Sequence, residues 1–595
     1  MQALICKCIL HFKTPAYCSE CKCFYSIFTL RDEMGNCISR NSLFHSWKQE
    51  ESRRKDLPIL EYAELSSTVG AEDLAANDLN NNSIPKLVIT KPTPLSELSN
   101  NAQSFLNSIN VMSGPKFELP IENIGNYAYN QIMKQPRHKE ALVIFGTSRT
   151  TYRTLLKMIM HIADVVKNFY NENTDVHILL LSSNCCEIVA VILACHLCNI
   201  AVAVVKPSLA DALIEDIQHL NVVALFCTDE NTSVGKRLKK QLCLKDAYLI
   251  RSDEILRISD TDEEIKKISM KKKRSAFQNT KLLEQFSALN DPDRIALTLW
   301  TLGRSGKQKK VSISFFNLAS SLAVIKKTIK LKESCRVLDL LPLHHPFGIT
   351  LCLYNVLTSG CCMLMLYQLT PKVLLECLEN EKVTFCFAVP PVIKFLATTC
   401  ITNHNLSSLQ QIFTVAAAIN CSHVSMLQNR FPNLHLHNGY GLCETTSITH
   451  IAALSKNNNT CLIGSLMPNT ECKIVNPVTG YAQCSNRIGE IAVRGPTIIL
   501  STTNNPTEMT YVDAHGWLHT GDFGFYDKEE CFYVLGKMKS RTDEEYLQKI
   551  IHAGIDKIMY QKEAFSNENI STDVEITLDY PTSETDSSTS EENLI

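Results

Sequence analysis

The chain has 595 residues, of which 45% are hydrophobic and 20% charged, a balance typical of a globular protein with several domains. Its formal net charge is −2 at pH 7, so bulk charge gives no support to a nucleic-acid-binding or membrane-surface protein. Many of the 25 cysteines lie in apolar runs, which predicts buried free thiols and a reducing, intracellular compartment, the cytoplasm.

Residues 1–116 differ in composition from the rest and are predicted to form a cysteine-containing, partly disordered extension. The stretch "CSECKC" at 18–23, with Cys6, Cys8 or His11, offers ligands for zinc. No clean second Cys-x-x-Cys or histidine pair follows it within residues 1–116, so unligated thiols are the alternative. The start, "MQALICKCILHF", lacks the basic region and cleavage site of a secretory signal.

An α/β pattern begins near residue 117. Apolar residues then recur at a spacing of three to four, which predicts one amphipathic helix containing Leu155, Leu156, Ile159, Ile162, Ala163, Val166 and Phe169. The apolar run 178–205 is long enough for a membrane span, but Glu187 and His196 interrupt it, so we predict a buried strand, helix and strand. Strands alternating with helices predict parallel sheets covered on both faces.

Two further segments interrupt or end this pattern. Residues 251–290 are polar and contain the basic run "KKISMKKKRS", which indicates a solvated linker or, alternatively, a nuclear-import signal. The α/β pattern resumes at "DRIALTLW" and continues to about residue 540. Residues 571–595 are acidic and lack lysine and arginine, which predicts a disordered tail. The closing "NLI" is not a peroxisomal signal.

The segment "WTLGRSGKQKKV" at 300–311 follows the apolar strand "DRIALTLW" and precedes a predicted helix. A glycine-bearing loop in this position presents backbone N–H groups to phosphate oxygens. It is not a Walker loop, because Thr301 and Gln308 occupy the positions of a required glycine and a required serine or threonine. Taken alone, the segment predicts either a phosphate loop or a surface turn.

Four later motifs follow in order: "LPLHHPFGI" (341–349), "HNGYGLCETTS" (437–447), "GEIAVRGP" (489–496) and "GWLHTGDFGFYDKEECFYVLGKMKS" (516–540). Together with the loop, they resemble the adenylate-forming superfamily of acyl-CoA synthetases, 4-coumarate–CoA ligases and firefly luciferases. The resemblance implies an α/β fold with two stacked mixed or parallel sheets flanked by helices and a smaller β-barrel-like subdomain. It assigns residues 117–539 to the AMP-binding domain.

The same resemblance implies an activity. A small-molecule carboxylic acid, fatty or aromatic, would react with ATP and Mg²⁺ to give an acyl-adenylate and pyrophosphate, and the acyl group would pass to coenzyme A. In the phosphate loop, the positions that match the family are Trp300, Thr301, Gly303, Gly306 and Lys309, while Leu302, Arg304 and Lys310 replace a serine, a threonine and a glycine. The hydroxyls of Thr301 and Ser305 are retained, and Arg304 adds a cation.

In "GYGLCETT", the resemblance assigns adenine stacking to Tyr440, close backbone approach to Gly441 and Mg²⁺ binding to Glu444. Cys443 replaces the threonine that contacts the α-phosphate, and a thiol is the weaker donor. The alternative for Glu444 is a solvated loop carboxylate. Asp522 matches the ribose-binding aspartate, with a plain turn residue as its alternative.

"HHPFG" places His345 near the implied meeting point of acyl group and adenylate, although a packed histidine pair or a metal site also fits these residues. Ala416 and Ala417 replace two glycines of the family, so added methyl groups are expected to crowd the pocket. Lys537 matches the arginine of the hinge motif, and Lys539 is the hinge residue.

After Ser540 no family motif is found, so residues 540–570 are predicted to be a vestigial hinge and C-terminal segment. The C-terminal lid domain, which brings a lysine to the reacting groups, is therefore expected to be absent or vestigial, or the sequence to be incomplete. Two functions stay open: an acid–thiol ligase, and a catalytically impaired pseudoenzyme that binds nucleotide, acyl group or a partner. The sequence does not name the acid or the oligomeric state.

Overall fold

The computed structural model describes residues 110–119, 123–172, 174–181, 184–252, 254–258, 265–267, 291–302, 308–415, 419–455, 461–499, 511–540 and 543–552, and the backbone of 16–18 and 23–25. The chain divides into two compact units, Met1–Thr93 and Pro94–Ile595. In the first, β1 (Ala16–Cys18) pairs antiparallel with β2 (Cys23–Tyr25). The predicted zinc ligands, the basic run and the acidic tail lie outside the described side chains.

One sheet of the second unit has eight strands with a parallel centre. In sheet order they are β11 (Ile265–Lys267), β10 (Ile255–Ile258), β9 (Asp246–Ile250), β8 (Val222–Cys227), β6 (His177–Leu181), β7 (Ala201–Val205), β12 (Ile295–Leu302) and β13 (Gln308–Ser314). Strands β9, β8, β6, β7 and β12 run parallel, whereas β10, β11 and β13 join antiparallel. The β12–β13 hairpin therefore lies at the edge of this sheet.

The second sheet begins with a mixed portion, whose first and last strands pair antiparallel and whose other strands run parallel, and it continues into antiparallel strands. The first portion consists of β5 (Ser148–Thr151), β4 (Glu140–Phe145), β15 (Cys362–Leu366), β14 (Arg336–Asp339), β16 (Phe385–Ala388), β17 (Gln411–Val415), β18 (His435–Gly441) and β19 (Ile448–Leu454). The antiparallel portion consists of β20 (Leu462–Leu466), β26 (Phe532–Lys537), β25 (Leu518–Tyr526), β23 (Gly489–Arg494), β21 (Glu471–Val475) and β22 (Ala482–Gln483), with β24 (Tyr511–Val512) and β3 (Met112–Ser113) paired to β25 and β21.

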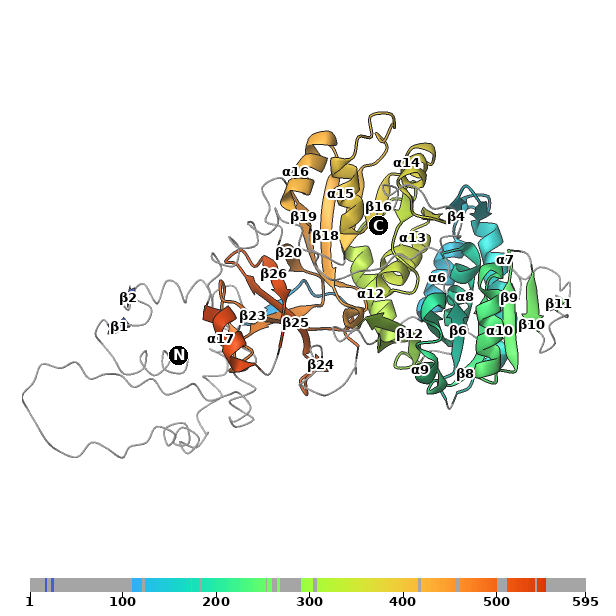
Figure 1. The fold of residues 1–595 in the computed structure, drawn as a ribbon, viewed down its shortest axis with the longest axis horizontal. Helices are drawn as coiled ribbons and strands as arrows, with labels where there is room; N and C mark the ends of the chain where they lie inside the picture. Colours follow the sequence, from blue (N-terminus) through green and yellow to red (C-terminus); the bar gives the residue numbers. More distant parts are fainter. Residues whose placement is uncertain are drawn as a thin grey trace, which may run out of the picture. The chain divides into compact units, whose positions relative to one another are not determined.

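Helices cover the sheets as the alternation of elements predicts (Figure 1). The helices are α6 (Ile124–Met133), α7 (Tyr152–Val166), α8 (Cys186–Leu197), α9 (Ile214–Gln218), α10 (Thr232–Gln241), α12 (Phe315–Thr328), α13 (Asn355–Thr358), α14 (Pro371–Asn380), α15 (Pro390–Thr398), α16 (Cys421–Arg430) and α17 (Glu544–His552), with short 3₁₀ or π turns at η2 (Lys167–Phe169), η3 (Pro207–Leu209), η4 (Asp229–Asn231), η6 (Gly348–Tyr354) and η7 (Cys443–Thr445).

The core explains why the apolar run 178–205 stays inside the protein. Along β6, Ile178 and Leu180 join the large core shared with the second sheet, while Leu179 and Leu181 join a smaller core on the opposite face. This follows from the alternation of side chains along a strand. Helix α8 packs against α6 and α7 within the larger core, so it is apolar all round. Among the described residues, no helix is long and apolar enough to cross a membrane.

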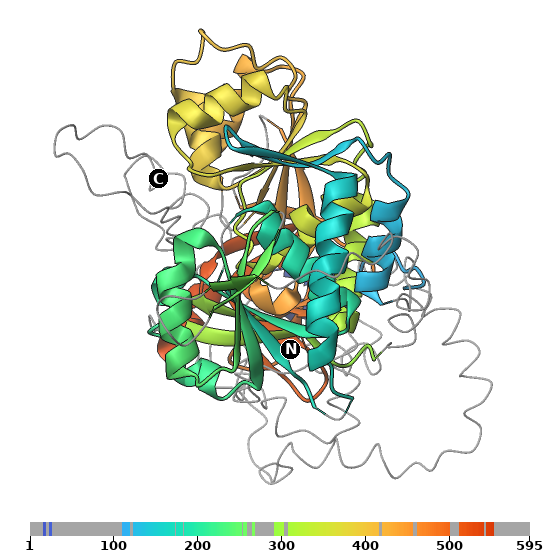
Figure 2. The same ribbon diagram turned by 90° about the vertical axis from the view of Figure 1, so that its right-hand side faces the viewer.

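Local capping and the apolar stripe account for α7. The side chain of Thr151 accepts the backbone N–H of Thr154, which satisfies one of the donors left open at a helix start. The stripe from Leu155 to Val166 is buried, as its spacing predicts, but α7 ends at Val166, and Phe169, which the same spacing places in this helix, lies in η2 and is only partly buried. In Figure 2 the yellow helices α14 and α15 lie at the top, and the green strands and helices of the eight-stranded sheet lie below them.

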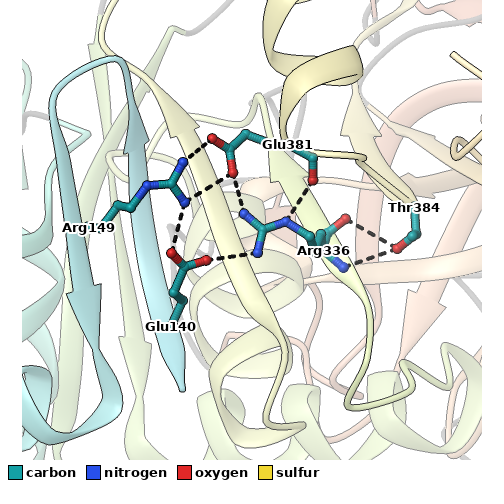
Figure 3. A network of polar contacts seen from close by, with 5 residues as sticks. All are labelled: Glu140, Arg149, Arg336, Glu381 and Thr384. Carbon is teal, nitrogen blue, oxygen red and sulfur yellow. Dashed lines mark hydrogen bonds and ion pairs between the residues drawn. The ribbon is translucent and has the colours of Figure 1, made fainter. Parts of the chain in front are cut away.

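An ion-pair network joins the β4–β5 hairpin to β14 and to the residue after α14 (Figure 3). Glu381, which follows α14, accepts hydrogen bonds from Arg149 of β5 and Arg336 of β14, and Glu140 of β4 contacts the same two arginines. Thr384 completes the network through the backbone of Arg336. Arg149 and Arg336 each contact both carboxylates. Each guanidinium group is therefore held in one orientation, whereas an isolated ion pair on the surface fixes its side chains less well.

Candidate active site

The β12–β13 hairpin places Thr301 directly opposite Lys309 in the antiparallel register. The turn between them, residues 303–307, lies outside the described residues, as does the side chain of Leu302. The roles expected of Gly303, Arg304, Ser305 and Gly306 therefore stay predictions. The hairpin positions the hydroxyl of Thr301 and the ammonium group of Lys309 on neighbouring strands at the edge of the sheet.

Lys309 forms an ion pair with Glu444, which lies in the short turn η7 after β18. Lys309 Nζ is 3.2 Å from Glu444 Oε1, and the two side chains are 22% and 8% exposed. The backbone oxygen of Glu444 accepts the N–H of Ile499 at 3.0 Å, which ties the turn to the segment after "GEIAVRGP". Glu444 is thus not a solvated loop carboxylate, because it is buried and paired with the cation of the loop hairpin.

Cys443 connects the same turn to the "HHPFG" segment. Its Sγ lies 3.2 Å from Nε2 of His345, and the side chain of Thr301 also hydrogen-bonds to it. Burial, with the charge of Glu444 next, raises the pKa of Cys443 to about 12, so the group is a thiol at neutral pH. Cys443 is the point at which three of the sequence motifs meet.

His345 is a hydrogen-bond donor in this arrangement. Burial, followed by the neighbouring His344, lowers the pKa of His345 to about 3, so the imidazole is neutral at physiological pH. Its Nδ1 accepts the backbone N–H of Phe347 at 3.2 Å. The single ring proton of the neutral form is therefore assigned to Nε2, where it points toward Cys443.

Tyr440 and Asp522 form the third pair of the site. The hydroxyl of Tyr440 donates to Oδ2 of Asp522 at 2.7 Å, and Asp522 is 3% exposed. Burial and the Asp522 charge raise the pKa of Tyr440 well above its usual range. Lys537 lies opposite Asp522 in the β25–β26 register and is itself exposed. The charges of Lys537 and Lys309 both act on the Cys443 thiol.

Two backbone positions near this cluster are sterically restricted. A Cβ on Gly441 would lie 2.4 Å from the carbonyl oxygen of Ser447, so no other residue fits without a backbone shift. Thr446 has a positive φ of 58°, an unusual conformation for a β-branched residue and one that gathers at functional sites. The motif "HNGYGLCETTS" contains Thr446 but gives no signal for this conformation, so sequence reasoning missed it.

Two residues at the start of α12, Ser314 and Asn317, form further contacts near the site that the motifs did not predict. Ser314 caps this helix in a reciprocal capping box with Asn317. The amide of Asn317 also donates to the carbonyl oxygens of Pro496 at 2.9 Å and Ile498 at 3.0 Å. The segment Ser314-x-x-Asn317 is a readable capping signal, but the second set of bonds follows only from the tertiary structure.

A family model described as "AMP-binding enzyme" matches residues 129–501, more than half of the chain. The chain belongs to the AMP-binding enzyme family. This confirms the family expected from the motifs, and the two sheets flanked by helices confirm the expected fold class.

This family member is similar in sequence to ligases and luciferases. It is 30% identical over 258 residues to 4-coumarate–CoA ligase 5 of Oryza sativa subsp. japonica, a match that covers 42% of the chain and 48% of the relative. It is 25% identical over 469 residues to luciferin 4-monooxygenase of Photinus pyralis, covering 76% and 83%. The matched part spans about half the length of the 4-coumarate–CoA ligases of rice and Narcissus pseudonarcissus.

Solved structures share the fold at lower sequence identity. The luciferase-like enzyme of the nonluminescent mealworm Zophobas morio superposes with a TM-score of 0.58 at 18% identity, covering 72% of this chain and 99% of that one. A long-chain-fatty-acid–CoA ligase of Archaeoglobus fulgidus gives a TM-score of 0.57 at 18% identity, covering 72% and 86%. These likenesses establish the architecture and leave the reaction to be argued from the site.

Magnesium can be tested against the donors present. Among the described segments, no group of three or more histidine, cysteine, aspartate or glutamate side chains could hold a metal ion. Mg²⁺ bound with a nucleotide needs only one or two carboxylates, because substrate phosphates and water supply the other ligands. Glu444, with a hard oxygen donor and little exposure, fits that mode of binding.

Proposed function

We propose that this family member activates a small-molecule carboxylic acid with ATP to form an acyl-adenylate and then transfers the acyl group to coenzyme A. The observation that supports it most is the 3.2 Å contact of Lys309 with Glu444. It joins the phosphate-loop hairpin to the "GYGLCETT" turn across two different sheets. Two unlike and largely buried charges from segments distant in sequence thus meet where the resemblance expects phosphate and Mg²⁺ to bind.

The proposed reaction begins with the attack of the acid's carboxylate on the α-phosphorus of ATP, and pyrophosphate leaves. Lys309 would turn from Glu444 to the phosphate oxygens, where its charge stabilises the transition state. Glu444 would hold Mg²⁺, which supplies further positive charge to the phosphates when bound. His345 would donate its Nε2–H to an oxygen near the reacting carboxyl group. Tyr440 and Asp522 would hold adenine and ribose.

One observation supports the alternative, a nucleotide-binding module with little turnover. Cys443 offers a protonated thiol where the related enzymes are expected to carry a hydroxyl, and a thiol is a weak hydrogen-bond donor. In addition, Lys309 is paired with Glu444, and Tyr440 is hydrogen-bonded to Asp522. A nucleotide that uses these four side chains has to replace both contacts when it binds. We place either function inside the cell, since the cysteines of the described segments are free thiols.

Carboxylate-dependent exchange of pyrophosphate into ATP distinguishes the two functions. The assay is run with aromatic, medium-chain and long-chain acids on the wild-type chain, on K309M and on K310M. Lys310 is the matched control, since it is the next residue along β13 and is exposed. A ligase predicts exchange that K309M lowers about 10²–10³-fold while K310M leaves it near the wild-type rate.

Absence of exchange with retained binding of ATP·Mg²⁺ would favour the module. Equal exchange rates in K309M and wild type would contradict the role proposed for Lys309. Absence of both exchange and nucleotide binding would overturn the proposed function in both forms. Circular dichroism and thermal melting of each variant establish that a lost signal does not come from a lost fold.

A further inference from the structure

Two cysteines lie side by side at one end of the second sheet, in a part of the structure that the proposed reaction does not use. Cys335 immediately precedes β14 and Cys361 immediately precedes β15. These strands are parallel, with Arg336 opposite Cys362, and the N–H of Cys362 donates to the carbonyl oxygen of Cys335 at 3.2 Å. The register therefore places Cys335 next to Cys361 across the two strands.

The two residues hold the same register position at the ends of adjacent strands. The Cys361 thiol donates to the carbonyl oxygen of Lys332 at 3.0 Å. Neighbouring strands are about 4.8 Å apart. That spacing falls within the range of about 4.4–6.8 Å that Cα atoms joined by a disulfide usually show. A sulfur–sulfur bond between these two residues needs little backbone movement.

The surroundings divide the pair into a reactive and a resolving thiol. The neighbouring Cys361 side chain is the first cause that lowers the pKa of Cys335 to about 6, and the charge of Lys332 adds to it. Cys335 is partly exposed, while Cys361 is fully buried, with the charges of Lys139 and Lys326 acting on it. Partial exposure in a positively charged environment is typical of oxidation-sensitive cysteines.

We propose that Cys335 and Cys361 form an oxidation site at which a hydroperoxide closes a reversible disulfide. The Cys335 thiolate attacks one peroxide oxygen, the O–O bond breaks, and hydroxide or alkoxide leaves, giving a sulfenic acid. The Cys361 sulfur then attacks the Cys335 sulfur, the S–O bond breaks, and the Cys361 proton leaves with the hydroxyl as water. The thiols lose two electrons and the peroxide gains them. The site does not depend on the proposed ligase activity.

The neighbouring Cys362 provides an internal comparison. It follows Cys361 directly, so along the strand its side chain points to the opposite face. The structure therefore predicts linkage of Cys335 to Cys361 and not to Cys362, although the two are adjacent in sequence.

The test is peptide mapping of the full chain after treatment with hydrogen peroxide, alkylation of remaining thiols under denaturing conditions and digestion with trypsin. Cleavage after Lys332 and Arg336 releases a tetrapeptide whose only cysteine is Cys335. The expected product is this tetrapeptide joined to the peptide of Cys361, two hydrogen atoms lighter than the separate pair. Fragmentation locates the bond at Cys361, and dithiothreitol reverses it.

Variants distinguish the two roles. C335S should abolish the linkage and leave Cys361 alkylated, whereas C361S should leave Cys335 as a sulfenic acid that dimedone traps. C400S, which removes an exposed thiol elsewhere, should leave the linkage unchanged. Linkage of Cys335 to Cys362, or a Cys335 sulfenic acid in the wild type that never condenses, would overturn the proposal. So would unmodified Cys335 under conditions that oxidise Cys400.

Discussion

Replacement of Cys443 by serine or threonine tests whether the thiol limits the reaction. The sulfur lies 3.2 Å from His345 Nε2 and is hydrogen-bonded to Thr301, so a hydroxyl oxygen at this position inherits two partners in a buried site. A hydroxyl that donates to a charged phosphate oxygen contributes about 1.5–3 kcal/mol. If that bond is stronger in the transition state, C443S should raise the rate of adenylation about 10–100-fold.

The assay is pyrophosphate exchange at saturating ATP and acid, with dissociation constants from calorimetry. C443A is the matched control, since it removes the thiol and adds no donor. C443T provides the same hydroxyl with one more methyl group, and a smaller gain than in C443S would measure crowding. Rates of C443S and C443T no higher than that of C443A would refute the reasoning, because the hydroxyl would then have no role in the transition state.

Three further predictions concern stability. Y440F removes the buried hydrogen bond to Asp522 and should lower the free energy of unfolding by about 1.5–3 kcal/mol in urea titration, because the acceptor is a carboxylate. E381A should lower it by about 1–3 kcal/mol, since Arg336 keeps only Glu140 as a carboxylate partner. D339N should gain stability relative to the wild type as the pH is raised from about 4 to about 7. Burial raises the pKa of Asp339 to about 7, whereas in the unfolded chain it is about 3.9. Between these two pH values the folded wild-type chain keeps a proton that the unfolded chain loses, so its free energy of unfolding falls as the pH rises.

The outcomes that contradict these predictions are distinct. A Y440F variant as stable as the wild type would show that the Asp522 carboxylate is solvated. For E381A, an R149A variant is the comparison, because Arg149 is 54% exposed and its loss should cost less. For D339N, the measured quantity is the difference in free energy of unfolding between variant and wild type. This difference cancels the contribution of buried histidines such as His196, whose pKa burial lowers to about 4 and which make both proteins more stable as the pH rises. A difference that does not change with pH would refute the account of Asp339.

The sequence predicted the fold where local patterns and motifs agree. The spacing of Leu155 to Val166 predicted α7, and the polar interruptions in 178–205 predicted β6, α8 and β7 rather than a membrane span. The ordered motifs predicted the family. They also predicted which segments meet, and the structure brings Lys309 to Glu444 and Tyr440 to Asp522.

The remaining features depend on contacts that no single motif contains. The tautomer of His345 follows from the backbone N–H of Phe347, which is placed by the turn into η6. The conformation of Thr446 follows from the closure of β18 onto β19. Cys335 and Cys361 are neighbours only because β14 and β15 pair in parallel, a register that neither segment encodes alone.

The central claim is that the clustered segments form a binding site for a purine nucleotide and an acyl group. Isothermal titration calorimetry of the full chain with ATP·Mg²⁺, and separately with a non-hydrolysable acyl-adenylate mimic, tests it most directly, with D522A as the comparison. We predict heat of binding for both ligands, tighter for the mimic and weakened in D522A, which should unfold at a lower temperature than the wild type, as Y440F does, but stay folded at the temperature of the titration. No heat with either ligand from a folded wild-type chain would contradict the account.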